Sequence, residues 1–197
     1  MTQHIALQPQ RRRASLNSTA LVAIVAVAVA LVVAGVAWFV ILKPSDSGKL
    51  STSATLTTGA HAATAGGLVA ASESLGRPIY WAGKRSGMTY ELTLTKSGNT
   101  YVRYLTAGVK PGDSRPDFVT VGTYPQANAY QVLTAANKIK NARIQTLAGG
   151  ELAVSYPTRP KSVYVAKPGS KYMVEVFAPV SRGAETLVRN GLIVPVK

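Results

Sequence analysis

The chain has 197 residues, with 22 Lys and Arg against 8 Asp and Glu, a formal net charge of +14, and no cysteine. Disulfides and thiolate chemistry are therefore excluded. From residue 76 onward there are 17 basic and 6 acidic residues, so most of the positive charge belongs to the carboxyl-terminal part. A field of this sign favours anionic partners, namely nucleic acid, phospholipid headgroups or anionic polymers of a cell envelope, although a basic surface can also serve solubility alone.

An uncharged apolar segment runs from residue 21 to residue 42. As a helix it would reach about 33 Å, enough to cross a hydrocarbon core of ~30 Å. Its first part alternates Val and Ala, which is also a strand pattern, but a lone strand in lipid would leave its backbone groups unpaired. The segment exceeds the ~7 to 15 apolar residues of a cleaved signal peptide, and the nearest A-x-A motif beyond its end begins only at Ala60. We therefore predict a transmembrane helix over 21–42 that is retained as a signal-anchor.

Two features of this segment indicate how it would contact the membrane interface and a neighbouring helix. Trp38 and Phe39 lie near its carboxyl end, where aromatic side chains anchor a helix at the membrane interface. Ala26, Ala30 and Ala34 recur at every fourth position, a spacing that allows two helices to approach closely. These alanines predict either a homodimer through the membrane or simple packing against lipid.

The charged flanks predict the orientation. Arg11, Arg12 and Arg13 precede the segment without any acidic residue, whereas Lys43 and Lys49 follow it together with an aspartate. Because basic residues resist translocation, residues 1–20 are expected to form a disordered cytoplasmic tail, and the carboxyl-terminal portion is expected outside the cell membrane. The arginines are the topology signal and can also contact anionic lipid.

Residues 43–67 are rich in Ser, Thr, Ala and Gly, and Pro44 follows the apolar segment directly. Proline ends a helix, and this composition is typical of a flexible tether. His61 lies in this stretch and is expected to be exposed to solvent without a ligand.

Residues 68–197 predict one extracytoplasmic α+β domain with a mixed sheet, because short runs rich in β-branched and aromatic residues alternate with segments of helical periodicity. Eight to nine strands and two to three helices are expected. The expected strands are 79–82, 89–95, 101–106, 118–124, 143–147, 152–156, 162–166, 172–177 and 192–196, and the expected helices lie near 68–75, 125–139 and 182–189.

Parts of the domain echo one another. Residues 77–82 and 90–92 resemble 159–166 and 175–176, and the helix that follows Pro125 resembles the one that follows Pro179. Two ββα-like halves around one sheet would explain the echo, although matches this sparse also arise by chance.

Catalytic constellations are missing from the predicted domain. His4 and His61 both precede it, so no Ser-His-Asp triad, Cys-His pair or histidine metal site is expected within it. Ser-Lys pairs at 84–86 and 96–97 have the composition of polar turns. Glu91 alternates with Tyr90 and Leu92, which predicts a solvated strand face rather than a member of a catalytic carboxylate pair. No enzyme activity, metal or cofactor is therefore expected.

Two loops and one strand have alternative interpretations. Asp113 and Asp117 could share a calcium ion, but a turn in which aspartate accepts bonds from backbone amides fits better. Residues 83–86 lack the spacing of a phosphate-binding loop and indicate a basic turn. Tyr101 and Arg103 share one strand face while Tyr104 points away, so at most a partial platform for nucleic-acid bases is expected, and a position at the edge of the core is favoured.

The segments 75–83, 89–92, 101–104 and 121–125 together resemble a set of uncharacterised single-pass membrane proteins of actinobacterial type. The resemblance covers most of residues 68–196. It implies the topology and a shared fold, and it transfers no functional residue.

These patterns predict a membrane-anchored binding module for anionic envelope components or a protein partner. The candidate contacts are four loop cations, Lys84, Arg85, Lys110 and Arg115. Two alternatives stay open. One is a cytoplasmic domain that binds nucleic acid, which the predicted orientation disfavours. The other is an envelope hydrolase that works without histidine.

Overall fold

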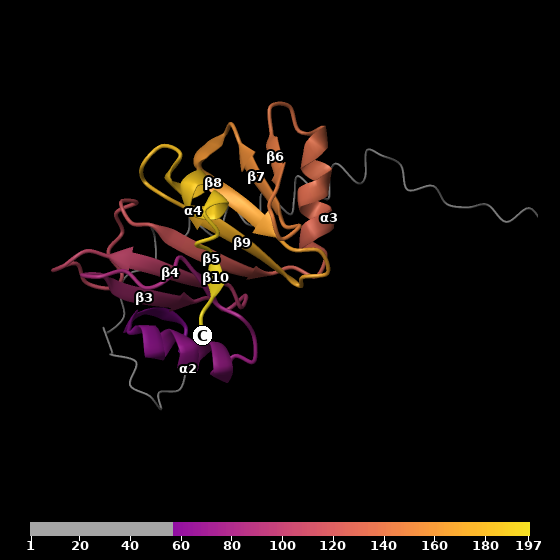
Figure 1. Cartoon of the computed structure of the whole chain (residues 1–197). Coiled ribbons are helices and arrows are strands. Elements are labelled where there is room, and N and C mark those ends of the chain that lie inside the picture. Colours follow the sequence, from indigo (N-terminus) through magenta and orange to yellow (C-terminus); the bar gives the residue numbers. More distant parts are fainter. Residues whose placement is uncertain (1–56) are drawn as a thin grey trace, which may run out of the picture.

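The computed structural model of the chain describes residues 57–197 (Figure 1). The predicted tail, transmembrane helix and first part of the linker lie outside the described residues. The arginine topology signal, the Trp38–Phe39 anchor and the stripe formed by Ala26, Ala30 and Ala34 lie there as well, so all of these stay predictions. Among residues 57–197, no helix combines the length and the apolar character that are needed to span a membrane.

The described residues form an α+β domain, as predicted. Eight strands build one antiparallel sheet in the order β1-β3-β4-β5-β9-β8-β7-β6. The bounds are β1 Gly59–Ala63, β3 Thr89–Leu94, β4 Thr100–Leu105, β5 Thr120–Pro125, β6 Arg143–Thr146, β7 Leu152–Tyr156, β8 Arg159–Ala166 and β9 Tyr172–Phe177. A separate two-stranded ladder pairs β2 Tyr80–Trp81 with β10 Val194–Pro195.

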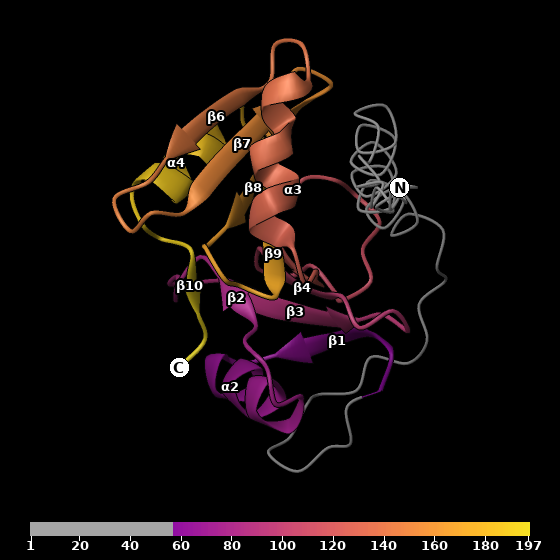
Figure 2. The same cartoon turned by 90° about the vertical axis from the view of Figure 1, so that its right-hand side faces the viewer.

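The helices cover both faces of the sheet. The side chains of Val102, Val121 and Val176 lie opposite one another on one face, which packs against α2 and α4. We call it the α2/α4 face. The other face carries α3 over β7, β8 and β9 (Figure 2), with the 3₁₀ helix η2 against β6, and we call it the α3 face. The bounds are α2 Ala65–Ser74, α3 Ala129–Thr134, η2 Ala135–Lys138 and α4 Gly183–Arg189.

The strand order is symmetric about the central pair β5 and β9. Each of these strands ends a three-stranded meander and leads into a helix, β5 into α3 and β9 into α4. The sequence echo around Pro125 and Pro179 therefore falls on corresponding positions of the two halves. The echo between residues 77–82 and 159–166 does not, because β2 belongs to the separate ladder whereas β8 belongs to the main sheet.

The structure differs from the sequence-based prediction at β1 and at β3, which lie at one edge of the sheet. The linker was expected to extend to residue 67, but Gly59–Ala63 is already a strand paired with β3, and His61 lies in it opposite Leu92. Small residues can pair through their backbone without any apolar alternation, so β1 leaves no periodic signal. Glu91 was expected in solvent but is 0% exposed, because β3 is covered on both faces.

Candidate ligand cavity and basic cleft

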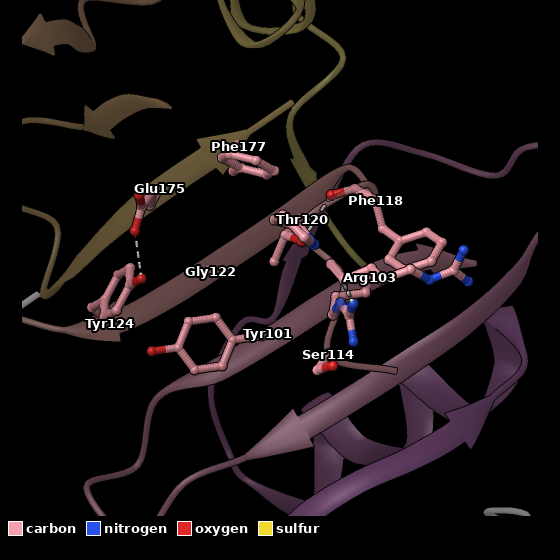
Figure 3. Close-up of a pocket in the computed structure, with 11 residues that line it drawn as sticks. Tyr101, Arg103, Ser114, Phe118, Thr120, Gly122, Tyr124, Glu175 and Phe177 are labelled. Atoms are coloured by element: carbon pink, nitrogen blue, oxygen red, sulfur yellow. Dashed lines mark hydrogen bonds between the residues drawn. The ribbon is translucent and has the colours of Figure 1, made fainter. Parts of the chain in front are cut away.

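A cavity of about 110 Å³ lies on the α3 face, where β4, β5 and β9 extend beyond the cover of α3. Its walls are aromatic, with Tyr101 from β4, Tyr124 from β5, Phe177 from β9 and Phe118 just before β5. Figure 3 shows these rings around the bare stretch of β5 at Gly122. The opening is bounded by the exposed residues 114–116. A cavity of this volume has room for a small ligand and none for a folded polymer.

Gly122 makes room for this cavity. It lies opposite Tyr101 in β4 and opposite Glu175 in β9, so all three positions belong to one row across the sheet. A Cβ atom at residue 122 would lie 2.9 Å from the hydroxyl oxygen of Tyr124, closer than packing allows. The ring of Tyr124 therefore lies over the glycine, as expected where a strand glycine permits a close approach.

Glu175 is a buried carboxylate that is held by three hydroxyl groups. Tyr124 donates to Oε2 at 2.6 Å, while Ser162 and Tyr164 donate to Oε1 at 2.8 and 3.0 Å. The residue is 3% exposed and lines the cavity. Burial, and then the negative charge of Glu175, raise the pKa of Tyr124 and Tyr164 well above the usual value. Both phenols therefore stay protonated and act as donors.

A second buried carboxylate, Glu91, ties the segment that covers the cavity to the sheet. Arg103 Nη1 lies 3.1 Å from Oε1 of Glu91, and the side chains are 4% and 0% exposed. The amide of Gly112 donates to Oε2 of Glu91 at 2.7 Å, and Nη2 of Arg103 donates to the carbonyl of Arg115 at 3.1 Å. One ion pair thus fixes residues 112–115 from both ends.

The loop aspartate makes a turn, as predicted. Asp113 Oδ1 accepts a bond from the amide of Arg115 at 2.9 Å, and Oδ2 accepts one from Nη2 of the same residue at 2.8 Å. These bonds lower the pKa of Asp113 to about 2. Residues 57–197 hold no group of three or more His, Cys, Asp or Glu side chains that could bind a metal ion.

The four predicted loop cations do not form one patch. Lys84 and Arg85 lie in the loop before β3, where Arg85 is placed over the ring of Tyr104 on the α2/α4 face. Lys110 and Arg115 lie in the segment after β4 that covers the α3 face, and Arg115 is engaged by Asp113. The two pairs therefore share one end of the sheet but belong to opposite faces.

Two arginines that the sequence did not single out line a cleft between β6 and α4. The cleft has a volume of about 260 Å³, and Arg143 and Arg189 line it together with Gln145, Ser155 and Glu185. Within residues 57–197, neither arginine forms an ion pair. Arg189 lies in the last turn of α4, where a cation is favourable for the helix dipole. The local sequence does not link these positions, because β6 comes near α4 only through its pairing with β7 in the sheet.

Comparisons of the chain with protein-family models, with curated proteins and with solved structures found no match in any of the three.

Proposed function

We propose that the chain is a single-pass membrane-anchored, non-enzymatic binding module whose basic domain lies outside the cytoplasmic membrane and binds anionic components of the cell envelope. The observation that carries the proposal is the excess of unneutralised positive charge. Of the 17 basic residues from residue 76 onward, only Arg103 and Arg115 form ion pairs within the described part of the chain. Such a field attracts polyanions and raises their local concentration.

The anion site that we propose on this surface is the cleft between β6 and α4, where Arg143 and Arg189 lie together. Two guanidinium groups can each offer paired N–H donors to a phosphate or carboxylate, and the side chains of Gln145 and Ser155 add further polar groups. All four residues of β6 are exposed, and β6 is an edge strand, so a long ligand can lie along it. The loop cations Lys84 and Lys110 are exposed and extend the basic surface at another end of the domain.

The alternatives have less support. A platform for nucleic-acid bases needs accessible aromatic rings, but Tyr101 and Arg103 are both buried. Ser86 lies in an exposed turn, and Ser97 shares a hydrogen bond with Thr95 rather than with a lysine.

The test measures binding of the full chain, inserted in nanodiscs of neutral lipid, to a soluble glycerol-phosphate polymer and to vesicles that contain phosphatidylglycerol. We expect R143E/R189E to weaken binding by at least about tenfold, because each cation near an anionic surface contributes about 1 kcal/mol. The polymer and the vesicles distinguish the two sources of phosphate.

The matched control is K167E/K171E, which changes the net charge equally in the turn between β8 and β9. We expect it to retain most of the binding. An equal loss in both variants would show general charge attraction and would exclude a site in the cleft. A third variant reverses Lys84, Arg85, Lys110 and Arg115, and unchanged binding there would remove the loops from the contact surface. If the wild-type chain binds neither probe, the proposed function is wrong.

A further inference from the structure

We propose that the aromatic cavity on the α3 face binds a primary ammonium group carried on a short aliphatic chain. This inference does not depend on the proposed function, since it concerns another site and a ligand of opposite charge. It rests on a buried carboxylate that has no cationic partner among residues 57–197 and lies beside an aromatic-walled cavity.

The two arginines that line the cavity are already paired. Arg103 is paired with Glu91, and Arg115 is paired with Asp113. Glu175 is different, because within residues 57–197 it makes hydrogen bonds to hydroxyl groups only and has no ion pair. Of the three ionisable acid and arginine side chains that line the cavity, Arg103, Arg115 and Glu175, Glu175 is therefore the one that no ion pair balances within the described residues. Burying an unpaired charge is unfavourable, and a bound cation would offset it.

The carboxylate of Glu175 has an acceptor position left for a ligand. A carboxylate offers about four lone-pair sites over its two oxygens. Oε1 accepts from both Ser162 and Tyr164, whereas Oε2 accepts only from Tyr124. One position on Oε2 remains for a further donor. A primary ammonium has N–H groups to fill it, whereas a quaternary ammonium has none.

The aromatic rings of the cavity limit where a cation can lie. A cation is attracted to the face of an aromatic ring within about 6 Å. Phe118 already has the guanidinium groups of Arg103 and Arg115 at 4.9 and 5.5 Å from its centroid. The ammonium is therefore assigned to the other end, beside Glu175, where Tyr124 and Phe177 also line the cavity (Figure 3). The aliphatic chain then extends toward the opening at residues 114–116 and contacts Phe177 and Phe118.

The size of the cavity limits the ligand. A volume of about 110 Å³ admits a short amine but excludes a sugar chain or a folded peptide. The amine can be a free small molecule or the end of a lysine side chain of a partner protein. Both present the same group to Glu175.

The experiment is saturation-transfer NMR on the full chain in nanodiscs, with n-butylammonium as the probe. n-Butanol and n-butyrate are the neutral and anionic isosteres. We expect butylammonium to receive saturation and to bind at least tenfold more tightly than either isostere. The Nα-acetyl-lysine N-methylamide is titrated in parallel. Tighter binding of this derivative assigns the cavity to a partner's lysine, and weaker binding assigns it to a free amine.

The matched variants are E175Q, which keeps the shape and removes the charge, and E73Q, which makes the same change at an exposed position of α2. We expect E175Q to abolish selectivity for the ammonium and E73Q to retain it. F177L keeps the carboxylate and removes one aromatic wall, and it is expected to weaken binding severalfold. Thermal unfolding of each variant shows whether it is folded. Equal binding of butylammonium and butanol to the wild type, ammonium selectivity that survives in folded E175Q, or undiminished binding of butylammonium to folded F177L would overturn the inference.

Discussion

The buried pair of Glu91 and Arg103 gives the sharpest test of how the cavity is built. Replacing either partner alone leaves the other charge buried, since both side chains are almost completely inaccessible. Breaking a pair of this kind costs about 3 to 5 kcal/mol of unfolding free energy. We therefore expect R103M and E91M each to lose an amount in that range.

The double variant E91M/R103M removes both charges at once. Replacing a buried ion pair by apolar side chains is often neutral, but here the amide of Gly112 and the carbonyl of Arg115 also lose their partners. Each unsatisfied group costs about 1 to 3 kcal/mol, and less if water replaces the partner. We expect the double variant to lose clearly less than the sum of the two single losses.

The assay is urea unfolding of the full chain in detergent micelles, followed by tryptophan fluorescence. A W38F background leaves Trp81, which is 9% exposed, as the sole reporter. Limited proteolysis in the same variants should cut within residues 106–119, because that segment loses its anchors. If the double variant loses the sum of the two single losses of unfolding free energy, or if either single loss is below about 1 kcal/mol, the claim that the pair is buried is refuted. An exposed pair contributes only about 1 kcal/mol.

G122A should lower the free energy of unfolding by about 1 to 3 kcal/mol in urea, because its methyl group displaces the ring of Tyr124 in a packed site. The control G149A, in a surface turn, should lower it little, since only the flexible carboxylate of Glu151 must move. Burial raises the pKa of Tyr101, Tyr104, Tyr124, Tyr156 and Tyr164 above 10.0. The stability that these protonated phenols contribute is therefore fully present below pH 10 and is lost as the pH rises through their folded-state pKa. Absorbance at 295 nm should show that fewer phenols titrate near pH 10 in the folded protein than the nine tyrosines present. The bonds to Arg115 lower the pKa of Asp113 from 3.8 to about 2, so the contact between Asp113 and Arg115 should hold above pH 3.8 and be lost as the pH falls toward 2. Proteolysis of the loop should detect this loss, and D113N should abolish its pH dependence.

Local patterns predicted most of the strands because their side chains carry the information. In β3, β4 and β9, β-branched and aromatic residues recur with the period of a strand, and the observed bounds agree closely with the expected ones. β1 has the sequence Gly-Ala-His-Ala-Ala, which has no apolar alternation, and it is a strand only because β3 offers it a free edge.

The buried carboxylates show where local pattern fails. Glu91 alternates with apolar residues, and this pattern usually marks a solvated strand face. The hairpin nevertheless predicts that Arg103 is its partner. The turn at 96–99 sets a register in which Glu91 faces Arg103, and opposite charges at facing positions indicate a pair. Glu175 had no such signal. Its donors Tyr124, Ser162 and Tyr164 come from two other strands, and the pairing of β5 with β9 joins segments far apart in the sequence.

The proposal that the basic domain meets anionic partners outside the membrane depends on the orientation of the chain. The most direct measurement treats intact cells that express the full chain with an impermeant protease and then probes for residues 57–197 with an antibody. We predict that the domain is digested in intact cells, as the charge on residues 11–13 implies. Protection until the membrane is opened would contradict the proposal, and salt-dependent binding to DNA and RNA would then be the property to measure.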